Sequence, residues 1–344
     1  MTFGSSFFAD HYEGRNVLVT GADGFIGSHL VEALVQCRAH VTGLCMYNSF
    51  DTQGWLDDLA PSAREFLNIV RGDVRDPGFM RGIIRNQDTV FHLAALIAIP
   101  HSYVAAQSYV ETNVLGTLNV LEAARDNNIR RMVHTSTSEV YGTALTVPIA
   151  EPHPLQGQSP YSATKIGADM LAESFARSHD LPVVTLRPFN TFGPRQSERA
   201  VIPTVLRQAL DPKATAIRVG DLTTIRDFTF VEDTATAFLA LGAAQKPDFG
   251  RAYNAGTGHS VTIGEIVRLI CDLTHCAKPV EHETHRMRPA KSEVRELLAD
   301  ARLLTRTTGW APQFSLEDGL AKTVAWWRRR LVEGKVRSEI AYAT

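Results

Sequence analysis

Two side chains with complementary acid–base chemistry, Tyr161 and Lys165, lie four residues apart in a segment whose pattern is typical of a helix. Residues at this spacing share one helix face, so we expect the lysine ammonium beside the tyrosine hydroxyl. A neighbouring positive charge favours the phenolate. A phenolate formed near neutral pH can remove the proton from an alcohol hydroxyl. The pair therefore predicts a general base that acts on a hydroxyl-bearing compound.

A second group of polar residues precedes this pair, between residues 136 and 142. Thr137 can hydrogen-bond the same hydroxyl, and Glu139 adds a second titratable group. A surface or capping role is the alternative for Glu139, but its polar neighbours favour a functional one. The predicted catalytic residues are Thr137, Ser138, Glu139, Tyr161 and Lys165.

A glycine-rich turn lies near the start of the chain, between a short aliphatic run that ends at Thr20 and a helical pattern. Its spacing is G-x-x-G-x-x-G. The first glycine permits a tight turn, the second lets backbone amides approach a pyrophosphate, and the third allows close helix packing. The helix N-terminus favours the anion. This strand–turn–helix context predicts a dinucleotide site rather than a purely structural turn, at Gly21, Gly24, Phe25, Ile26 and Gly27.

The second predicted strand, from His40 to Cys45, ends without the acidic residue that usually receives the ribose hydroxyls of adenosine. Cys45 occupies that place, and Met46, Tyr47 and Asn48 follow. No arginine comes directly afterwards to bind a 2′-phosphate. The predicted cofactor is NAD, with NADP as the alternative.

Four more strands are predicted, at 67–74, 88–95, 130–136 and 181–187, with helical segments between most of them. The first of these ends at Asp73 and Val74, where a carboxylate could reach the adenine amino group; a helix N-cap is the alternative for Asp73. The next runs into Leu93, Ala94 and Ala95, whose backbone could lie against a cofactor. Alternating strands and helices predict an α/β fold with a doubly wound parallel Rossmann sheet, and ligand sites lie at the carboxyl ends of such strands.

The sequence changes character after residue 187, where prolines, glycines and short β-type runs replace the alternating pattern. We predict a dinucleotide-binding domain at 1–187 that carries the catalytic pair. A smaller mixed substrate lobe is predicted at 188–344, from which a strand or helix could return to the first domain. Guanidinium groups match phosphate geometry, although a surface ion pair is the alternative for each arginine. The candidate substrate residues are Asn190, Arg195, Arg226 and Arg288.

Composition restricts the class of protein further. The formal net charge is −2 and 44% of residues are hydrophobic, so we expect neither a nucleic-acid partner nor a membrane partner. The start has no apolar core typical of a signal peptide, and the four cysteines indicate no disulfide framework, which favours the cytoplasm. Cys271 and Cys276 lie near His275, His282 and His285, but their spacing fits no common zinc site, and we predict no metal.

Taken in order, these motifs resemble the extended short-chain dehydrogenase/reductase family, also described as NAD-dependent epimerases/dehydratases. The resemblance rests on the glycine turn, Asp73, the segment from His92 to Ala95, the Tyr161-x-x-x-Lys165 pair, and Arg187-Pro-x-Asn190. It covers the chain from about Arg15 to Leu331. It implies a cytoplasmic enzyme that acts on a nucleotide sugar, often as a homodimer joined through helices that would begin near Val104 and Tyr161.

Glu139 directs the resemblance to one branch of that family. It falls where sugar 4,6-dehydratases place a base, whereas sugar 4-epimerases usually lack an acid there. Ser138 stands where the dehydratases generally have Asp, and a Ser-Glu pair also occurs in uronic-acid decarboxylases. The segments 47–56 and 159–165 most resemble the N-acetylglucosamine-nucleotide 4,6-dehydratases of the legionaminic acid pathway.

This resemblance implies a sequence of steps on the sugar. Tyr161 takes the proton of the C4 hydroxyl while C4 passes hydride to NAD, Glu139 removes the C5 proton, the C6 hydroxyl leaves as water, and hydride returns to C6. Ser138 leaves open whether Glu139, or a water held by Ser138, protonates the leaving hydroxyl. The alternatives are a decarboxylase, a 4-epimerase, and a non-catalytic NAD sensor or scaffold. The intact Thr137, Tyr161 and Lys165 argue against the sensor or scaffold.

Overall fold

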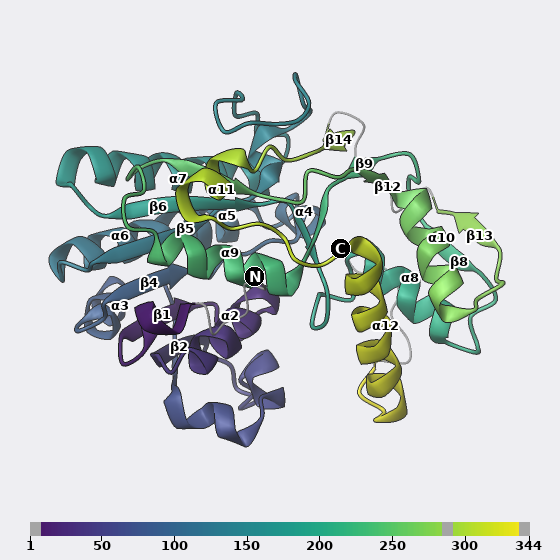
Figure 1. Ribbon diagram of the computed structural model, residues 1–344, viewed down its shortest axis with the longest axis horizontal. Helices are drawn as coiled ribbons and strands as arrows, with labels where there is room; N and C mark the ends of the chain where they lie inside the picture. The colour runs from purple at the N-terminus through teal and green to yellow at the C-terminus, as the bar shows by residue number, and fades with distance from the viewer. Residues whose placement is uncertain (1–7, 284–291, 337–344) are drawn as a thin grey trace.

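A seven-stranded parallel sheet forms the centre of the larger part of the molecule, at the left of Figure 1. The computed structural model describes residues 8–283 and 292–336. Every neighbouring pair of strands in this sheet is parallel, which confirms the predicted doubly wound fold. The strand order is β11 (Ala252–Ala255), β6 (Val183–Pro188), β5 (Arg131–Thr135), β4 (Thr89–His92), β1 (Asn16–Thr20), β2 (His40–Met46) and β3 (Leu67–Gly72).

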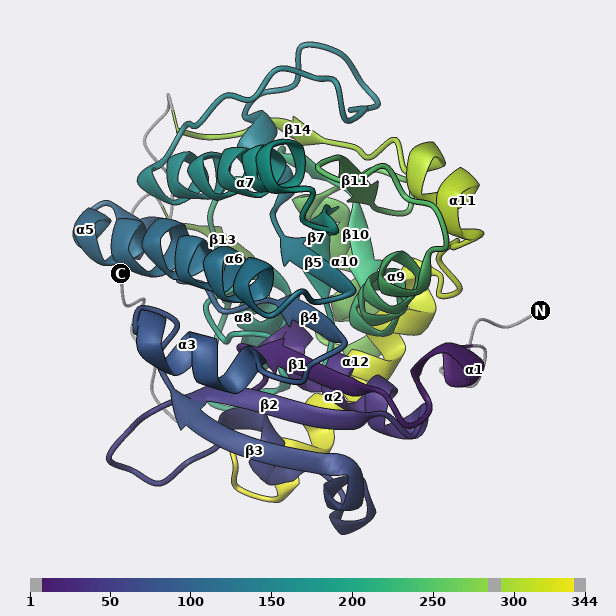
Figure 2. The ribbon, with the colours of Figure 1, turned by 90° about the vertical axis from the view of Figure 1, so that its left-hand side faces the viewer.

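Alternation along the strands explains why helices cover both faces of the sheet (Figure 2). On β1, Leu18 joins one apolar cluster, whereas Val17 and Val19 join the other. The Leu18 side is covered by α3 (Pro77–Ile84), α6 (Gly116–Asp126) and α7 (Pro160–His179). The opposite side is covered by α2 (Phe25–Gln36), α9 (Val231–Ala243) and α11 (Arg302–Thr308), while α1 (Ala9–Tyr12) packs at its margin.

Two elements that follow residue 187 belong to this larger part. Helix α9 packs against α2 and the sheet, and β11 pairs with β6 at the sheet edge. One of the short β-type runs after residue 187 forms the strand β10 (Phe228–Phe230), and α9 begins at once after it. The apolar residues of α9 cover the sheet, which favours the helix over a longer strand. The division of the chain at residue 187 stays a prediction.

The helix predicted to begin near Val104 is interrupted rather than uniform, and it ends at Asp126. It follows α4 (Ile99–Ser102) and consists of α5 (Ala106–Tyr109), a π-helical turn η4 (Val110–Leu115) and α6. The π-turn places Asn113 in the interior, where its side chain bonds both the amide and the carbonyl of Leu96 and also Thr164 Oγ1. This asparagine therefore ties the segment after β4 to the catalytic helix α7.

The smaller lobe, at the right of Figure 1, is built from short strands and three helices around its own apolar cluster. Its strand pairs are β7 with β10, β9 with β12 and β14, and β8 with β13. No helix in the described parts of the chain is both long and apolar enough to cross a bilayer. The elements are β7 (Asn190–Phe192), α8 (Val201–Leu210), β8 (Ile217–Val219), β9 (Ile225–Arg226), β12 (Val261–Thr262), α10 (Ile263–Thr274), β13 (Val280–His282), β14 (Glu296–Leu297) and α12 (Leu316–Val332).

The last helix of the lobe also contacts the larger part. Near the end of α12, the Arg330 guanidinium lies over the rings of Trp55 and Trp326, 4.9 and 5.1 Å from their centroids, and the two rings contact each other edge to face. Arg330 Nη1 donates to Asp58 Oδ2 at 2.7 Å. Trp55 and Asp58 belong to the 3-10 helix η2 (Gly54–Asp58), which is followed by η3 (Pro61–Phe66). The contacts of Arg330 with Trp55 and Asp58 join the lobe to the connection between β2 and β3.

Candidate active site

The predicted catalytic residues come from two neighbouring elements, the turn after β5 and the first turns of α7. Thr137 caps the short 3-10 helix η5 (Ser138–Tyr141), because its Oγ1 accepts the Glu139 amide at 3.2 Å. Helix α7 begins after a capping box in which Ser159 and Ser162 bond each other's backbone amides. The two caps fix the backbone on which Thr137, Glu139 and Tyr161 are presented, at the carboxyl end of the central strands.

Tyr161 is the meeting point of this group. Its side chain is only 7% exposed and packs on the edge of the Tyr109 ring, with 6.3 Å between centroids. Burial raises the pKa of Tyr161, a hydrogen bond with Thr137 lowers it, and the negative charge of Glu139 raises it again. Thr137 and Glu139 therefore both act on the Tyr161 hydroxyl, while Ser138 between them is buried.

Lys165 is placed one turn further along α7 and is 4% exposed. Its ammonium donates to the Thr135 carbonyl at 2.6 Å. Burial lowers the pKa of Lys165 to about 8, and the charge of Asp169 works against that decrease. From the sequence, this lysine was expected to favour the phenolate. The net pKa of Tyr161 is nevertheless raised, because the cost of burying a phenolate outweighs the groups that favour it.

Beneath Lys165 lies a charged network that the sequence argument did not identify. Asp169 Oδ2 accepts bonds from Ser136 Oγ at 2.8 Å and from the Arg187 guanidinium at 2.9 and 3.1 Å. His134 Nε2 lies 3.3 Å from the other carboxylate oxygen. Burial opposes the charge of Asp169, but His134 and Arg187 outweigh it and keep the pKa of Asp169 below its ordinary value. The one signal in the sequence is the i, i+4 spacing of Lys165 and Asp169.

A second buried chain of hydrogen bonds holds the strand ends that face the dinucleotide. Thr20 Oγ1 accepts the amides of Leu93 and Ala94, both at 3.1 Å, and lies 2.8 Å from His92 Nδ1. The other ring nitrogen of His92 lies 3.0 Å from Thr117 Oγ1. The predicted cofactor residues Leu93, Ala94 and Ala95 thus follow directly from a strand end whose backbone is fixed from below.

The glycine turn has the shape that a dinucleotide requires. Gly21 has φ +68°, and a Cβ there would lie 2.9 Å from the Ala94 backbone; a Cβ on Gly27 would lie 2.1 Å from the Gly21 carbonyl oxygen. Gly24 is exposed and precedes α2 as an N-cap without a side-chain acceptor, so the amides that begin at Phe25 and Ile26 are left for an anion. These residues fit a bound pyrophosphate.

The structure excludes the capping alternative for Asp73. Helix α3 is capped by Asp76, whose carboxylate accepts the Phe79 amide at 2.9 Å. Asp73 instead accepts a hydrogen bond from the Arg75 side chain, with 2.6 Å between Oδ2 and Nη2. This bond is the largest of the effects that lower the pKa of Asp73. Val74 is buried, and its carbonyl accepts Asn119 Nδ2 at 3.0 Å. Both lie just beyond the end of β3, on the edge where adenine was predicted.

The candidate substrate residues differ in their surroundings. Asn190 begins β7, and its Oδ1 is buried without a hydrogen-bond partner among the described residues. Arg226 is buried in β9, where its guanidinium bonds the carbonyls of Ile225 and Arg295 and meets Glu293 Oε1 at 3.2 Å. Arg288 falls outside the residues that the structure describes. Asn190 thus offers an acceptor that a ligand could satisfy.

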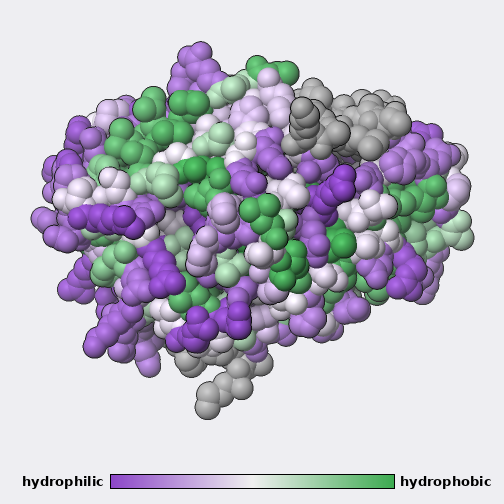
Figure 3. Space-filling view, turned by 90° about the horizontal axis from the view of Figure 1, so that it is seen from above, coloured by the Kyte–Doolittle hydropathy of each residue, from purple (hydrophilic) through white to green (hydrophobic). Residues whose placement is uncertain are grey.

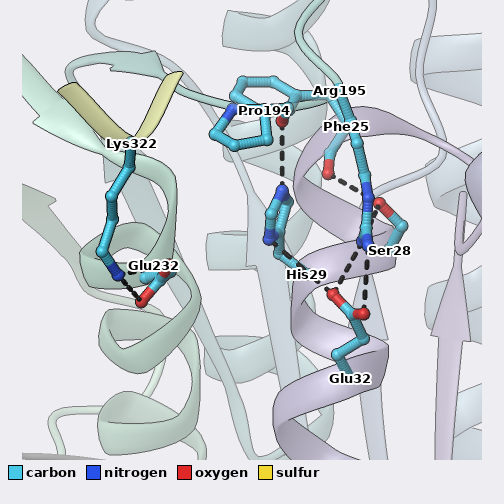
Figure 4. Close-up of polar contacts among 8 residues, drawn as sticks. All are labelled: Phe25, Ser28, His29, Glu32, Pro194, Arg195, Glu232 and Lys322. Atoms are coloured by element: carbon cyan, nitrogen blue, oxygen red, sulfur yellow. Dashed lines mark hydrogen bonds and ion pairs between the residues drawn. The ribbon is translucent and has the colours of Figure 1, made fainter. Parts of the chain in front are cut away.

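Arg195 has a different environment from the one predicted for a diphosphate ligand. Its guanidinium makes two bonds to the Glu32 carboxylate, at 2.7 and 3.0 Å, and one to Ser28 Oγ at 3.3 Å (Figure 4). Beside it, His29 Nε2 lies 3.1 Å from the Pro194 carbonyl oxygen. Arg195 therefore ties the start of the smaller lobe to α2, and its charge is already matched by a carboxylate.

The cysteine and histidine residues considered for zinc do not form a site in the described part of the chain. No group of three or more His, Cys, Asp or Glu side chains is close enough there to hold a metal ion. Cys271 and Cys276 are free thiols, His275 ends α10, and His282 ends β13. His285 lies outside the described residues.

Comparison with known proteins agrees with this geometry. The family model described as GDP-mannose 4,6 dehydratase matches residues 18–323. A dTDP-glucose 4,6-dehydratase from an Actinoplanes species is 36% identical over 318 residues, which cover 91% of this chain and 97% of that protein.

Solved structures give the same result. A dTDP-glucose 4,6-dehydratase from Streptomyces venezuelae, solved with NAD bound, superimposes with a TM-score of 0.83 at 32% identity, covering 92% of this chain and 98% of the other. A UDP-N-acetylglucosamine 4-epimerase from Methanobrevibacter ruminantium, in complex with UDP-N-acetylmuramic acid, gives 0.83 at 32% identity, with coverage of 92% and 99%.

The Rossmann sheet, the glycine turn and the Tyr161–Lys165 pair at the strand ends define a short-chain dehydrogenase/reductase of the extended type. Within that class, the chain belongs to the GDP-mannose 4,6-dehydratase family. The family predicted from the sequence motifs is thereby confirmed.

Proposed function

We propose that this protein is an NAD-dependent nucleotide-sugar 4,6-dehydratase. The observation that carries the proposal is the position of Glu139, whose charge acts on the hydroxyl of Tyr161. A carboxylate next to the base that deprotonates the C4 hydroxyl is what removal of a proton from C5 requires. The similarity to dTDP-glucose 4,6-dehydratases supports the same reaction.

Bound NAD supplies the oxidation of C4 and, after the elimination, the reduction of C6. The glycine turn would hold its pyrophosphate, with Asp73 and Val74 beside its adenine. The protein's own residues perform the proton transfers. Tyr161 removes the proton of the C4 hydroxyl while Thr137 bonds that hydroxyl, and Lys165 supports the phenolate electrostatically from the next turn of α7.

Elimination of water depends on Glu139. The C4 ketone makes the C5 proton acidic, and Glu139 removes it as the C6 hydroxyl departs. Ser138 replaces the acidic residue that dehydratases of this type generally have, and it is buried. We propose that Glu139 also delivers the proton to the leaving hydroxyl, since it is the titratable group beside Tyr161 in the 137–139 turn.

For the substrate we propose an N-acetylglucosamine nucleotide. The support is the resemblance of segments 47–56 and 159–165 to dehydratases that use such substrates. Arg226 is proposed to meet the diphosphate, because guanidinium groups match phosphate geometry and Arg226 is buried in β9. Asn190 is proposed to bind a sugar hydroxyl through its buried Oδ1. Arg288 stays a candidate from its sequence alone, and Arg195 is left out because Glu32 holds it.

The test is incubation of the purified protein with NAD and a panel of nucleotide sugars, followed by mass spectrometry. Loss of one water from an N-acetylglucosamine nucleotide is the expected result. Glu139→Gln should stall after C4 oxidation and lower the dehydration rate by about 100-fold or more. Glu173→Gln, the same change on an outer position of α7, is the matched control and should dehydrate normally. Normal dehydration by Glu139→Gln would exclude the assigned base.

The second candidate is a sugar 4-epimerase, which the similarity to a UDP-N-acetylglucosamine 4-epimerase favours. It uses the same C4 oxidation but needs no acid at position 139. Unchanged mass with inverted C4 stereochemistry, seen by NMR, would establish the epimerase. Loss of carbon dioxide from a uronic acid nucleotide would instead establish the decarboxylase.

We also propose that the protein forms a homodimer through the segment from α4 to α7. Exposed apolar side chains project from these elements, and the α7 side of the molecule, seen from above in Figure 3, shows hydrophobic residues among polar ones. Size-exclusion chromatography with light scattering tests this proposal, and a monomer at all concentrations would contradict it. The exposed residues are Tyr103, Val104, Val110, Leu115 and Met170.

A further inference from the structure

The end of β2 lacks the carboxylate that commonly receives the adenosine ribose, and the neighbouring residues do not replace it. Cys45 is buried, and burial raises the pKa of its thiol to about 12, so the thiol stays neutral. The Asn48 side chain is occupied within its own loop, where it bonds the carbonyls of Met46 and Thr52 and accepts the amides of Phe50 and Thr52. The ribose therefore needs an acceptor from another part of the chain.

Asp23, in the glycine turn, reaches this position from the neighbouring strand. Its Oδ2 accepts the amide of Met46, the last residue of β2, at 3.3 Å. Its negative charge is also one of the causes that raise the pKa of the Cys45 thiol, after burial. The hydrogen bond to Met46 thus places the Asp23 carboxylate at the carboxyl end of β2.

The backbone of Asp23 is held in place by the loop that follows β2. The Trp55 amide donates to the Asp23 carbonyl at 3.1 Å. Gly54 has φ +59°, and a Cβ there would lie 2.6 Å from the same carbonyl oxygen, so only glycine allows this approach. Trp55 is in turn stacked on Arg330 of α12. The carboxylate is therefore presented from a fixed backbone.

Arg71, a cation on the strand next to β2, is already paired with an acid. Arg71 pairs with Cys45 in the register of β2 and β3. Its guanidinium meets the Asp51 carboxylate at 2.5 Å and the Asp51 carbonyl at 3.2 Å. A 2′-phosphate that entered here would therefore meet the Asp23 carboxylate and an arginine that is committed to another acid.

We propose that Asp23 supplies the carboxylate that receives the adenosine ribose hydroxyls of NAD, and that it makes the protein reject NADP. A carboxylate can accept bonds from both ribose hydroxyls, whereas a 2′-phosphate replaces one hydroxyl with a group of like charge. The glycine turn thereby performs the task usually left to the end of β2. This inference concerns the cofactor alone and does not depend on which sugar is the substrate.

The test is calorimetric titration of the full-length protein, freed of bound nucleotide, with NAD and with NADP. Wild type should bind NAD at least about 10-fold more tightly than NADP. Asp23→Asn should weaken NAD binding about 10-fold and remove most of the discrimination, because hydrogen bonds to a charged acceptor are lost and the repulsion disappears. Asp23→Glu keeps the charge, so it should still discriminate against NADP.

Two further variants separate this effect from damage to the fold. Asp88→Asn makes the same charge change before β4, at the opposite end of the strands, and should leave both affinities unchanged. Asp51→Asn should tighten NADP several-fold by releasing Arg71, and its φ of +57° suits asparagine. Equal affinities of wild type for NAD and NADP would overturn the proposal. So would unchanged affinities in a folded Asp23→Asn, as judged by its thermal unfolding.

Discussion

The two ends of the candidate site hold their charged groups in opposite ways. At the strand ends of the larger sheet, the Lys165 ammonium is buried against a carbonyl, and Glu139 of η5 acts electrostatically on Tyr161 of α7. In the smaller lobe and its connection, the charges are already matched, since Arg195 faces Glu32 and Arg226 faces Glu293. In the first region burial disfavours the charged form of Lys165, whereas in the second region each arginine is paired with a carboxylate.

This difference distinguishes residues that take part in a reaction from residues that hold two parts of the chain together. A buried amine with a lowered pKa is costly to fold in its charged form, so the retention of Lys165 indicates a reaction that uses it. Paired arginines stabilise the contact between two parts of the chain and become ligands only where donors remain. Three changes test the contrast, in order of decreasing expected effect.

The largest effect should come from Tyr161→Phe. Loss of the general base is expected to lower kcat by about 1,000-fold, with NAD and nucleotide-sugar affinities close to wild type. Steady-state turnover and calorimetric binding measure the two quantities. Tyr109→Phe is the control, because its ring packs on Tyr161 while its hydroxyl donates to the Ala98 carbonyl at 2.6 Å. Comparable losses in both variants would mean that packing, rather than proton transfer, is at stake.

The next effect is on stability and concerns Lys165. Its pKa of about 8 in the folded protein lies below the ordinary value of 10.5. Between these pH values the unfolded chain holds more protons, so the free energy of unfolding should rise with pH across that window. Below pH 8 the buried charge costs about 3 kcal/mol, given its near-complete burial.

Lys165→Met removes this titration and is the reference. Denaturant unfolding at several pH values should show wild type gaining about 3 kcal/mol relative to Lys165→Met between pH 7 and 10.5. The variant should also be nearly inactive. A difference that does not change with pH would show that the ammonium is not buried as the structure has it.

The smallest effect should come from the Arg195–Glu32 pair. A double-mutant cycle with alanine at both positions is expected to give a coupling of about 1 kcal/mol in unfolding, because the pair is only partly buried. KM for the nucleotide sugar should change less than about 3-fold in Arg195→Ala. Arg226→Ala, by contrast, should raise KM about 10-fold or more if it meets the diphosphate. An Arg195→Ala variant with the larger KM effect would reverse the contrast drawn here.

Periodicity predicted the fold of the larger part well. Hydrophobic strands with intervening helices specify a parallel sheet directly, and the predicted strand 40–45 differs from β2 by a single residue. Helix α9 was missed because its apolar run, residues 237–241, resembles a buried strand as much as a buried helix. Its identity is decided by contact with α2 and the sheet, which no local pattern reveals.

The site was predictable in proportion to how local its chemistry is. Helical spacing identifies Tyr161 and Lys165, and the spacing of its glycines identifies the glycine turn. The network of Asp169, His134 and Arg187 joins three different elements, so its members cannot be recognised until the strands are aligned. Arg195 was predicted to bind phosphate from its residue type alone, but its guanidinium is paired with the Glu32 carboxylate of α2.

The late position of α9 and β11 in the chain has a consequence for biosynthesis. The apolar face formed by Phe91 and its neighbours is covered by Phe238 of α9, and the sheet edge is completed only by β11, which ends at Ala255. A nascent chain of 187 residues therefore carries every nucleotide-binding motif yet leaves that face uncovered to solvent. The ribosome must translate some three-quarters of the message before the first half of the protein can acquire its native shape.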